Sequence, residues 1–131
     1  MTRMRMGFKW CEPPNPPGGL PLHKVNLFEI FLFHCMKQYL IIAQDGKDDD
    51  ALNRRKEIRP IHLAGARKLK ENGNFVIGGA MLDDDSNMRG SIMIVQFEKE
   101  EDFQKWYDNE PYITGGVWKE IEVKSFRVAE V

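Results

Sequence analysis

Residues 38–44 read QYLIIAQ and residues 91–97 read SIMIVQF. Both runs are short, rich in β-branched and aromatic residues and bounded by polar or glycine-containing segments, which is typical of strands. Alternate residues of a strand point to opposite faces of its sheet. The alternating sets are Tyr39, Ile41 and Ala43 against Leu40 and Ile42, and Met93 and Val95 against Ile92 and Ile94. Both faces of the predicted sheet are therefore apolar.

The rest of residues 36–131 alternates between strand and helix patterns. We expect strands over residues 38–44, 75–82, 91–97 and 118–126, helices over 52–72 and 99–109, an acidic loop over 45–50 and a polar hairpin loop over 83–90. Gly73 follows the first helix where a left-handed C-cap residue is expected. The order β-α-β-β-α-β predicts an α+β fold with the split βαβ, ferredoxin-like arrangement.

Two apolar sheet faces also predict an assembly. Two helices cover only one face of a four-stranded sheet, so the other face needs a different cover. A second copy of the sheet is the simplest cover, and we therefore expect a homodimer. The last strand alternates charged and apolar residues, which predicts a half-exposed sheet edge.

Residues 1–35 differ from the rest, because residues 12–21 hold five of the seven prolines. The apolar stretch that follows is a poor membrane span: a span needs about 20 apolar residues, and residues 25–42 include Glu29, His34 and Lys37. A signal peptide also fits poorly, because prolines interrupt the apolar region. We expect residues 1–35 to be a disordered or mis-assigned extension, rather than an ordered arm, and residues 36–131 to form one domain that begins at Met36.

Composition excludes several function classes. Lys and Arg total 19 and Asp and Glu total 20, spread along the chain, so no basic stripe indicates nucleic-acid binding. The two cysteines, Cys11 and Cys35, suit neither a disulfide framework nor a zinc site. The acidic runs 48–50 and 83–85 do not match a calcium loop. We expect a cytoplasmic protein with no metal, cofactor, nucleic-acid partner or membrane partner.

His62 is the first candidate site residue. Helical spacing puts it on one stripe with Ile58 and Leu69, beside the small residues Gly65 and Ala66, and space next to a titratable ring suggests a pocket. On spacing alone, a core histidine that bonds the sheet is the simpler interpretation.

Positive charge is expected around this histidine. Pro60 suits a first helical turn, so we expect the helix to kink or restart there and to leave N–H groups that favour anions. Arg55 and Arg59 add two cations one turn earlier.

Glu110 and Ser91 are further candidates with open alternatives. Pro111 disfavours helical geometry at Glu110, so that residue lies at the end of a helix. A carboxylate at a helix C-terminus gains nothing from the dipole, and the side chain is either solvated or turned inward. Ser91 is either a hydroxyl that binds a ligand or an ordinary residue at the start of a strand.

Six motifs resemble the YciI-like family in order and spacing. They are QYLIIAQD at 38–45, RPIHL at 59–63, GGAM at 78–81, GSIMIVQF at 90–97, EPY at 110–112 with GV at 116–117, and VKSF at 123–126. The resemblance covers residues 36–127 and implies a dimeric α+β barrel with a histidine–aspartate pair. The histidine falls on His62. The aspartate falls on Glu110, which keeps the charge and adds one methylene.

The resemblance also implies a chemistry, because one branch of the family removes HCl from a chlorinated hydroxyquinol. A carboxylate beside an imidazole sets its tautomer and raises its basicity, and proton abstraction with elimination needs no nucleophile. We expect His62 and Glu110 to act as an acid–base pair on a small anionic or phenolic molecule. The expected substrate-binding residues are Arg55, Arg59, Ser91 and Tyr112. The alternative is a small-molecule binding module without turnover.

Overall fold

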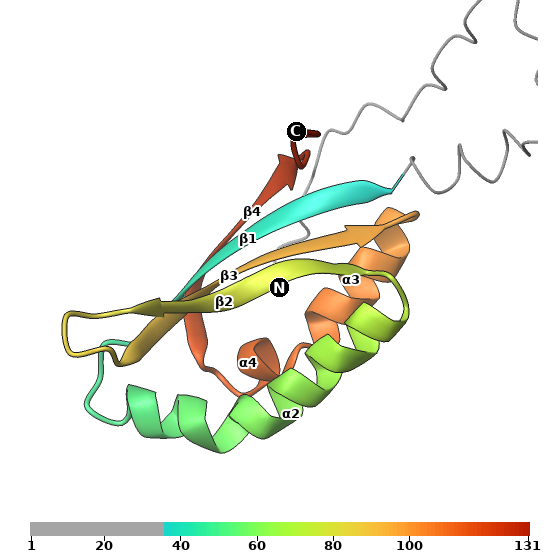
Figure 1. Cartoon of the computed structure of the whole chain (residues 1–131). Helices are drawn as coiled ribbons and strands as arrows, with labels where there is room; N and C mark the ends of the chain where they lie inside the picture. Colours follow the sequence, from blue (N-terminus) through green and yellow to red (C-terminus); the bar gives the residue numbers. More distant parts are fainter. Residues whose placement is uncertain (1–35) are drawn as a thin grey trace, which may run out of the picture.

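The computed structural model describes residues 36–131, and the predictions for residues 1–35 lie outside that range. The elements are β1 (Lys37–Asp45), α2 (Ala51–Glu71), β2 (Phe75–Leu82), β3 (Met88–Phe97), α3 (Glu100–Asn109), α4 (Pro111–Thr114) and β4 (Trp118–Phe126). Each strand pairs antiparallel with its neighbours in the order β2-β3-β1-β4 (Figure 1). The predicted α+β ferredoxin-like fold is confirmed, with the short helix α4 added.

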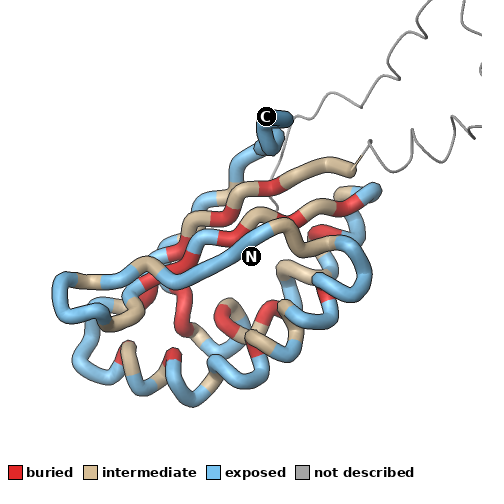
Figure 2. The backbone as a smooth tube through the Cα atoms, viewed as in Figure 1, coloured by how far each residue is buried: buried red, intermediate tan, exposed pale blue. Residues whose placement is uncertain are grey.

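The described helices all lie on one face of the sheet (Figure 1). Buried positions concentrate between that face and the helices (Figure 2). The core residues from the sheet are Tyr39, Ile41, Ala43, Met93, Val95 and Phe97. Tyr39 stacks on Phe103 of α3 with ring centroids 4.0 Å apart, and Phe103 is fully buried. Burying a phenylalanine side chain stabilises a fold by about 1.5–3 kcal/mol, so this stack anchors α3 to the sheet.

The opposite face of the sheet carries no helix within residues 36–131 (Figure 1). This surface is called here the open face. From the strand register, its apolar side chains are Leu40, Ile42, Ile77, Ile92, Ile94 and Phe126. Ile77 is 60% exposed, and Ile92 and Phe126 are each 39% exposed. The predicted two-sided apolar strands are confirmed, and β4 is a sheet edge as expected.

Helix α2 corrects one prediction. It runs without interruption from Ala51 to Glu71 and contains Pro60 in its interior, so no helix restarts beside His62. Its N-terminal turn lies about three turns before His62, at 3.6 residues per turn, and supplies no spare N–H groups there. Pro60 has no N–H of its own, so the carbonyl of Lys56 loses its donor one turn later. The C-terminus follows the prediction, because Gly73 adopts a φ of +77°.

Two strand boundaries and one helix also differ from expectation. Asp45 ends β1 rather than opening the acidic loop, and β3 begins at Met88 rather than Ser91 because its pairing with β2 extends through Met88. Helix α4 follows α3 directly, since Pro111 occupies its first turn, where a missing N–H costs nothing. No helix in this part of the chain is long and apolar enough to span a bilayer.

Candidate functional site

His62 and Glu110 meet where α2 packs against α4. The Nδ1 atom of His62 lies 2.5 Å from Oε1 of Glu110. The two side chains are only 10% and 2% exposed. The expected hydrogen bond between these residues is confirmed, although they are 48 positions apart in the chain. Their part in catalysis stays a prediction.

Glu110 is turned inward by the junction of α3 and α4. It has φ −62° and ψ 123°, the extended geometry that a following proline favours. The same Oε1 atom accepts a hydrogen bond from the backbone N–H of Tyr112 at 3.1 Å, so Glu110 is the N-cap of α4. The expectation that the carboxylate meets only a helix C-terminus was therefore incomplete, because α4 was not predicted. Two donors hold this oxygen in place.

This contact determines which nitrogen of His62 carries hydrogen. An ionised carboxylate only accepts hydrogen bonds, so Nδ1 must donate. The other nitrogen, Nε2, makes no hydrogen bond to another described residue. In the neutral ring Nε2 therefore holds the lone pair, and His62 presents a base on the side away from Glu110.

Aromatic side chains fix the plane of the imidazole. Tyr112 stacks on His62 with centroids 3.9 Å apart and planes inclined by 15°, and Trp118 meets the ring edge-on at 5.9 Å. Burial raises the pKa of the Tyr112 phenol, while Arg55 and Arg59 lower it. Because the net shift is upward from 10.0, Tyr112 stays neutral near pH 7 and does not compete with His62 as a base.

A second cluster of buried polar side chains adjoins His62. Arg55 Nη1 donates to both carboxylate oxygens of Asp45, at 2.9 and 3.1 Å. Arg55 Nη2 and Trp118 Nε1 donate to the Ser91 hydroxyl, at 2.8 and 3.3 Å. The Arg55 guanidinium also lies 4.7 Å from the centre of the Tyr112 ring. Arg55 and Ser91 thus have protein partners, and their predicted ligand contacts stay predictions.

Asp45 and Trp118 are two members of this group that were not predicted. For Asp45 a signal was present, since it continues the alternation of Tyr39, Ile41 and Ala43 toward the buried face. Burial raises the pKa of its carboxyl, and the Arg55 guanidinium opposes that rise. Trp118 gave no comparable signal, because a tryptophan at the start of a strand is ordinarily a core residue.

A cavity of about 170 Å³ opens beside this cluster, between α2 and the strands β2 and β3. Five of the six predicted site residues line it: Arg55, Arg59, His62, Ser91 and Tyr112. Glu110 contacts His62 but does not itself line the cavity. Among residues 36–131 no three His, Cys, Asp or Glu side chains gather in a way that could hold a metal ion.

Comparison with known proteins identifies the family. The sequence profile of the YCII-related domain matches residues 37–127. The chain belongs to the YCII-related domain family. It is 38% identical to Protein YciI of Escherichia coli O6:H1 over 95 residues, which cover 68% of this chain and 95% of the relative. An uncharacterized protein of Haemophilus influenzae is 30% identical over the same coverage. The YciI-like resemblance seen in the motifs is confirmed.

Among solved structures, the fold of this YCII-related chain is similar to a 5-chloro-2-hydroxyhydroquinone dehydrochlorinase from Burkholderia phenoliruptrix. The TM-score is 0.60 at 25% sequence identity, over 70% of this chain and 95% of the other. That enzyme was solved in complex with 2,5-dihydroxybenzoquinone.

Proposed function

We propose that this YCII-related protein is an acid–base enzyme of the lyase type that acts on a small phenolic or anionic ring. The observation that carries the proposal is the buried His62–Glu110 hydrogen bond, which leaves Nε2 of His62 as the base beside a cavity. A positioned histidine of this kind contributes about 10²–10⁴-fold to a proton-transfer step.

Elimination of HCl suits the residues at this site. Nε2 of His62 removes a proton from the ring substrate, and chloride leaves with the electron pair of the C–Cl bond. The reaction needs no oxidant, no reductant and no covalent enzyme intermediate. Glu110 stabilises the imidazolium that forms, and Arg59 at the cavity wall favours a phenolate over a phenol.

The size of the cavity supports a single-ring substrate. An apolar cavity of about 150 Å³ is known to hold one benzene molecule, and the cavity beside His62 measures about 170 Å³. The ligand named for the similar dehydrochlorinase is also one substituted ring.

We expect the full chain to release chloride from 5-chloro-2-hydroxyhydroquinone faster than the same solution without protein. An ion-selective electrode follows the release, and 2,5-dihydroxybenzoquinone should raise the melting temperature, because a ligand stabilises the state that it binds. Thermal stabilisation without chloride release would favour a binding module. Absence of both would contradict the proposal.

We further propose that the protein is a homodimer joined through the open face. Its apolar side chains, Ile77 and Ile92 among them, are exposed in the single chain, and covering them removes that surface from water. A flat sheet face is self-complementary when two copies pack across a two-fold axis.

Replacing Ile92 by lysine should halve the mass measured by sedimentation, from twice the 15.2 kDa chain mass to the monomer value. A charge at the centre of the open face has no partner once the face is buried, so association becomes unfavourable. Ile61→Lys is the matched control, because Ile61 is 63% exposed on α2, on the other side of the sheet. A wild-type monomer, or equal masses for the wild type and Ile92→Lys, would contradict this interface.

A further inference from the structure

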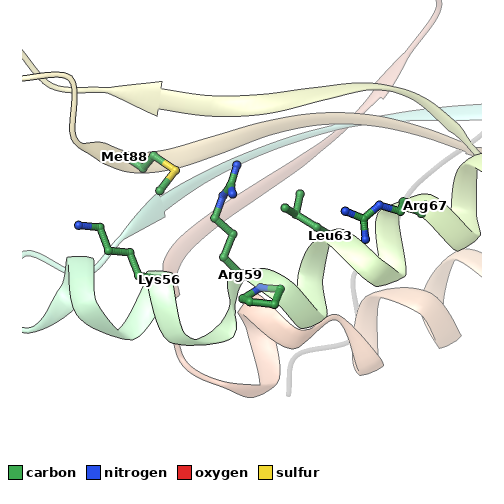
Figure 3. A pocket seen from close by; sticks show the side chains of 6 residues that line it. Lys56, Arg59, Leu63, Arg67 and Met88 are labelled. Atoms are coloured by element: carbon green, nitrogen blue, oxygen red, sulfur yellow. The ribbon is translucent and has the colours of Figure 1, made fainter.

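A second, larger cavity of about 390 Å³ opens on α2 beside the one that holds His62. This cavity is called here the outer groove. It is lined by Lys56, Arg59, Pro60, Leu63, Arg67 and Met88. Figure 3 shows Lys56, Arg59, Leu63 and Arg67 along one side of α2, with Met88 facing them from the start of β3. Spacings of three and four residues put these α2 side chains on one helix face.

The outer groove carries positive charge without compensation. Among residues 36–131, the arginines just before it form ion pairs, Arg54 with Asp48 and Arg55 with Asp45. In the same range, Lys56, Arg59 and Arg67 have no ion-pair partner, and neither cavity has an acidic residue in its lining. A concave surface lined by charges of one sign concentrates ions of the opposite sign.

The two cavities adjoin each other. Arg59 and Leu63 line both the outer groove and the smaller cavity beside His62, called here the inner cavity. A ligand in the inner cavity therefore meets the outer groove at these two side chains. The inner volume of about 170 Å³ holds one ring and little more. A longer substituent has room in the outer groove, where it meets the cations.

We infer that the substrate of this protein is an aromatic acid, with a hydroxylated ring in the inner cavity and a carboxylate-bearing arm in the outer groove. Arg59 stands at the junction and Arg67 contacts the arm. Lys56 lies about 16 Å from Arg67 along α2 and adds positive charge without touching the arm. A guanidinium binds a carboxylate through two parallel hydrogen bonds, so Arg67 gives direction as well as charge. This inference rests on the proposed function, because it places the reacting ring beside His62.

Two compounds that differ by the charge of a carboxylate and by one methyl group test the inference. The full chain is titrated calorimetrically with 2,5-dihydroxyphenylacetate and with its methyl ester. We expect the acid to bind about tenfold more tightly, as one charge-assisted contact with Arg67 and the weaker attraction of Lys56 would give. Added salt should weaken binding of the acid and leave the ester unchanged. Shifts of the His62 ring signals in NMR spectra report that the ring occupies the inner cavity.

Two variants assign the preference to the groove. In the double variant Lys56→Gln, Arg67→Gln most of the preference for the acid should be lost, while Lys68→Gln, which removes the same kind of charge from an exposed position outside the groove, should keep it. Equal binding of both compounds to the wild type, or an undiminished preference in the double variant, would overturn the inference and leave the His62 site standing. If neither compound shifts the His62 signals, the inference and the proposed function are both overturned.

Discussion

Replacing Arg55 by methionine is expected to lower the free energy of unfolding by about 3–5 kcal/mol, as removal of one partner of a buried ion pair typically does. The side chains of Arg55 and Asp45 are 3% and 2% exposed, and Arg55 donates to both oxygens of Asp45. Without Arg55 the carboxylate of Asp45, which is only 2% exposed, loses its counter-charge. Urea unfolding followed by circular dichroism measures the change.

Two controls separate the ion pair from general packing. Arg54→Met removes the neighbouring arginine, whose pair with Asp48 is partly exposed, and should leave the urea midpoint close to the wild-type value. Adding Asp45→Asn to Arg55→Met should recover a large part of the lost stability, because no unpaired charge remains. A double variant as unstable as Arg55→Met alone would show that packing of the arginine, not its charge, stabilises the fold.

The stability of the Arg55→Met variant should have a distinctive pH dependence. Burial already raises the pKa of Asp45, and Arg55 opposes the rise. In Arg55→Met that opposition is absent, so the folded state retains a proton on Asp45 that the unfolded state releases above its ordinary pKa of about 3.9. Stability then falls as pH rises above that value. The deficit relative to wild type should be smallest in acid and largest at neutral pH.

The second large effect is expected at His62. His62→Gln keeps a side-chain donor for Glu110 but has no group that titrates near neutral pH, and it should reduce the rate of chloride release by about 10²–10⁴-fold. Glu110→Gln should reduce the rate by about 10²-fold or more, because a neutral amide still caps α4 but does not stabilise the imidazolium. Steady-state kinetics with 5-chloro-2-hydroxyhydroquinone measure both.

Glu110→Asp is the matched control for charge. It restores the residue that the YciI-like resemblance implies at this position, keeps the carboxylate and shortens the side chain by one methylene. We expect it to retain most of the activity that Glu110→Gln loses. Unchanged turnover in both His62→Gln and Glu110→Gln would make the pair a structural feature of the α2–α4 contact.

The fold was predictable because local patterns and global architecture agree. The strands at residues 38–44 and 91–97 alternate cleanly, and the glycine after α2 adopts the left-handed conformation expected of it. The failures have local causes. The expected kink or restart at Pro60 is such a failure, because a proline on an exposed face of a long helix is tolerated when the rest of that helix is packed against the sheet.

The site was only partly predictable from the residues. Helical spacing put His62 on the inward face, but nothing local joins it to Glu110, because that contact depends on how α4 turns back toward α2. A helix of four residues leaves almost no periodicity to detect. The family resemblance supplied the pairing instead. Asp45 was assigned to the acidic loop because a buried aspartate is rare unless paired, and its partner Arg55 lies on another element.

The central claim is that Glu110 keeps the proton on Nδ1 of His62 and leaves Nε2 free to accept one. Long-range ¹H–¹⁵N correlation NMR distinguishes the two neutral tautomers of a histidine ring, and the spectrum is recorded at a pH where the His62 signals no longer change. We expect a protonated Nδ1 and an unprotonated Nε2, with the Nε2 signal shifting when 2,5-dihydroxybenzoquinone is added. A neutral His62 that carries its proton on Nε2 would contradict it.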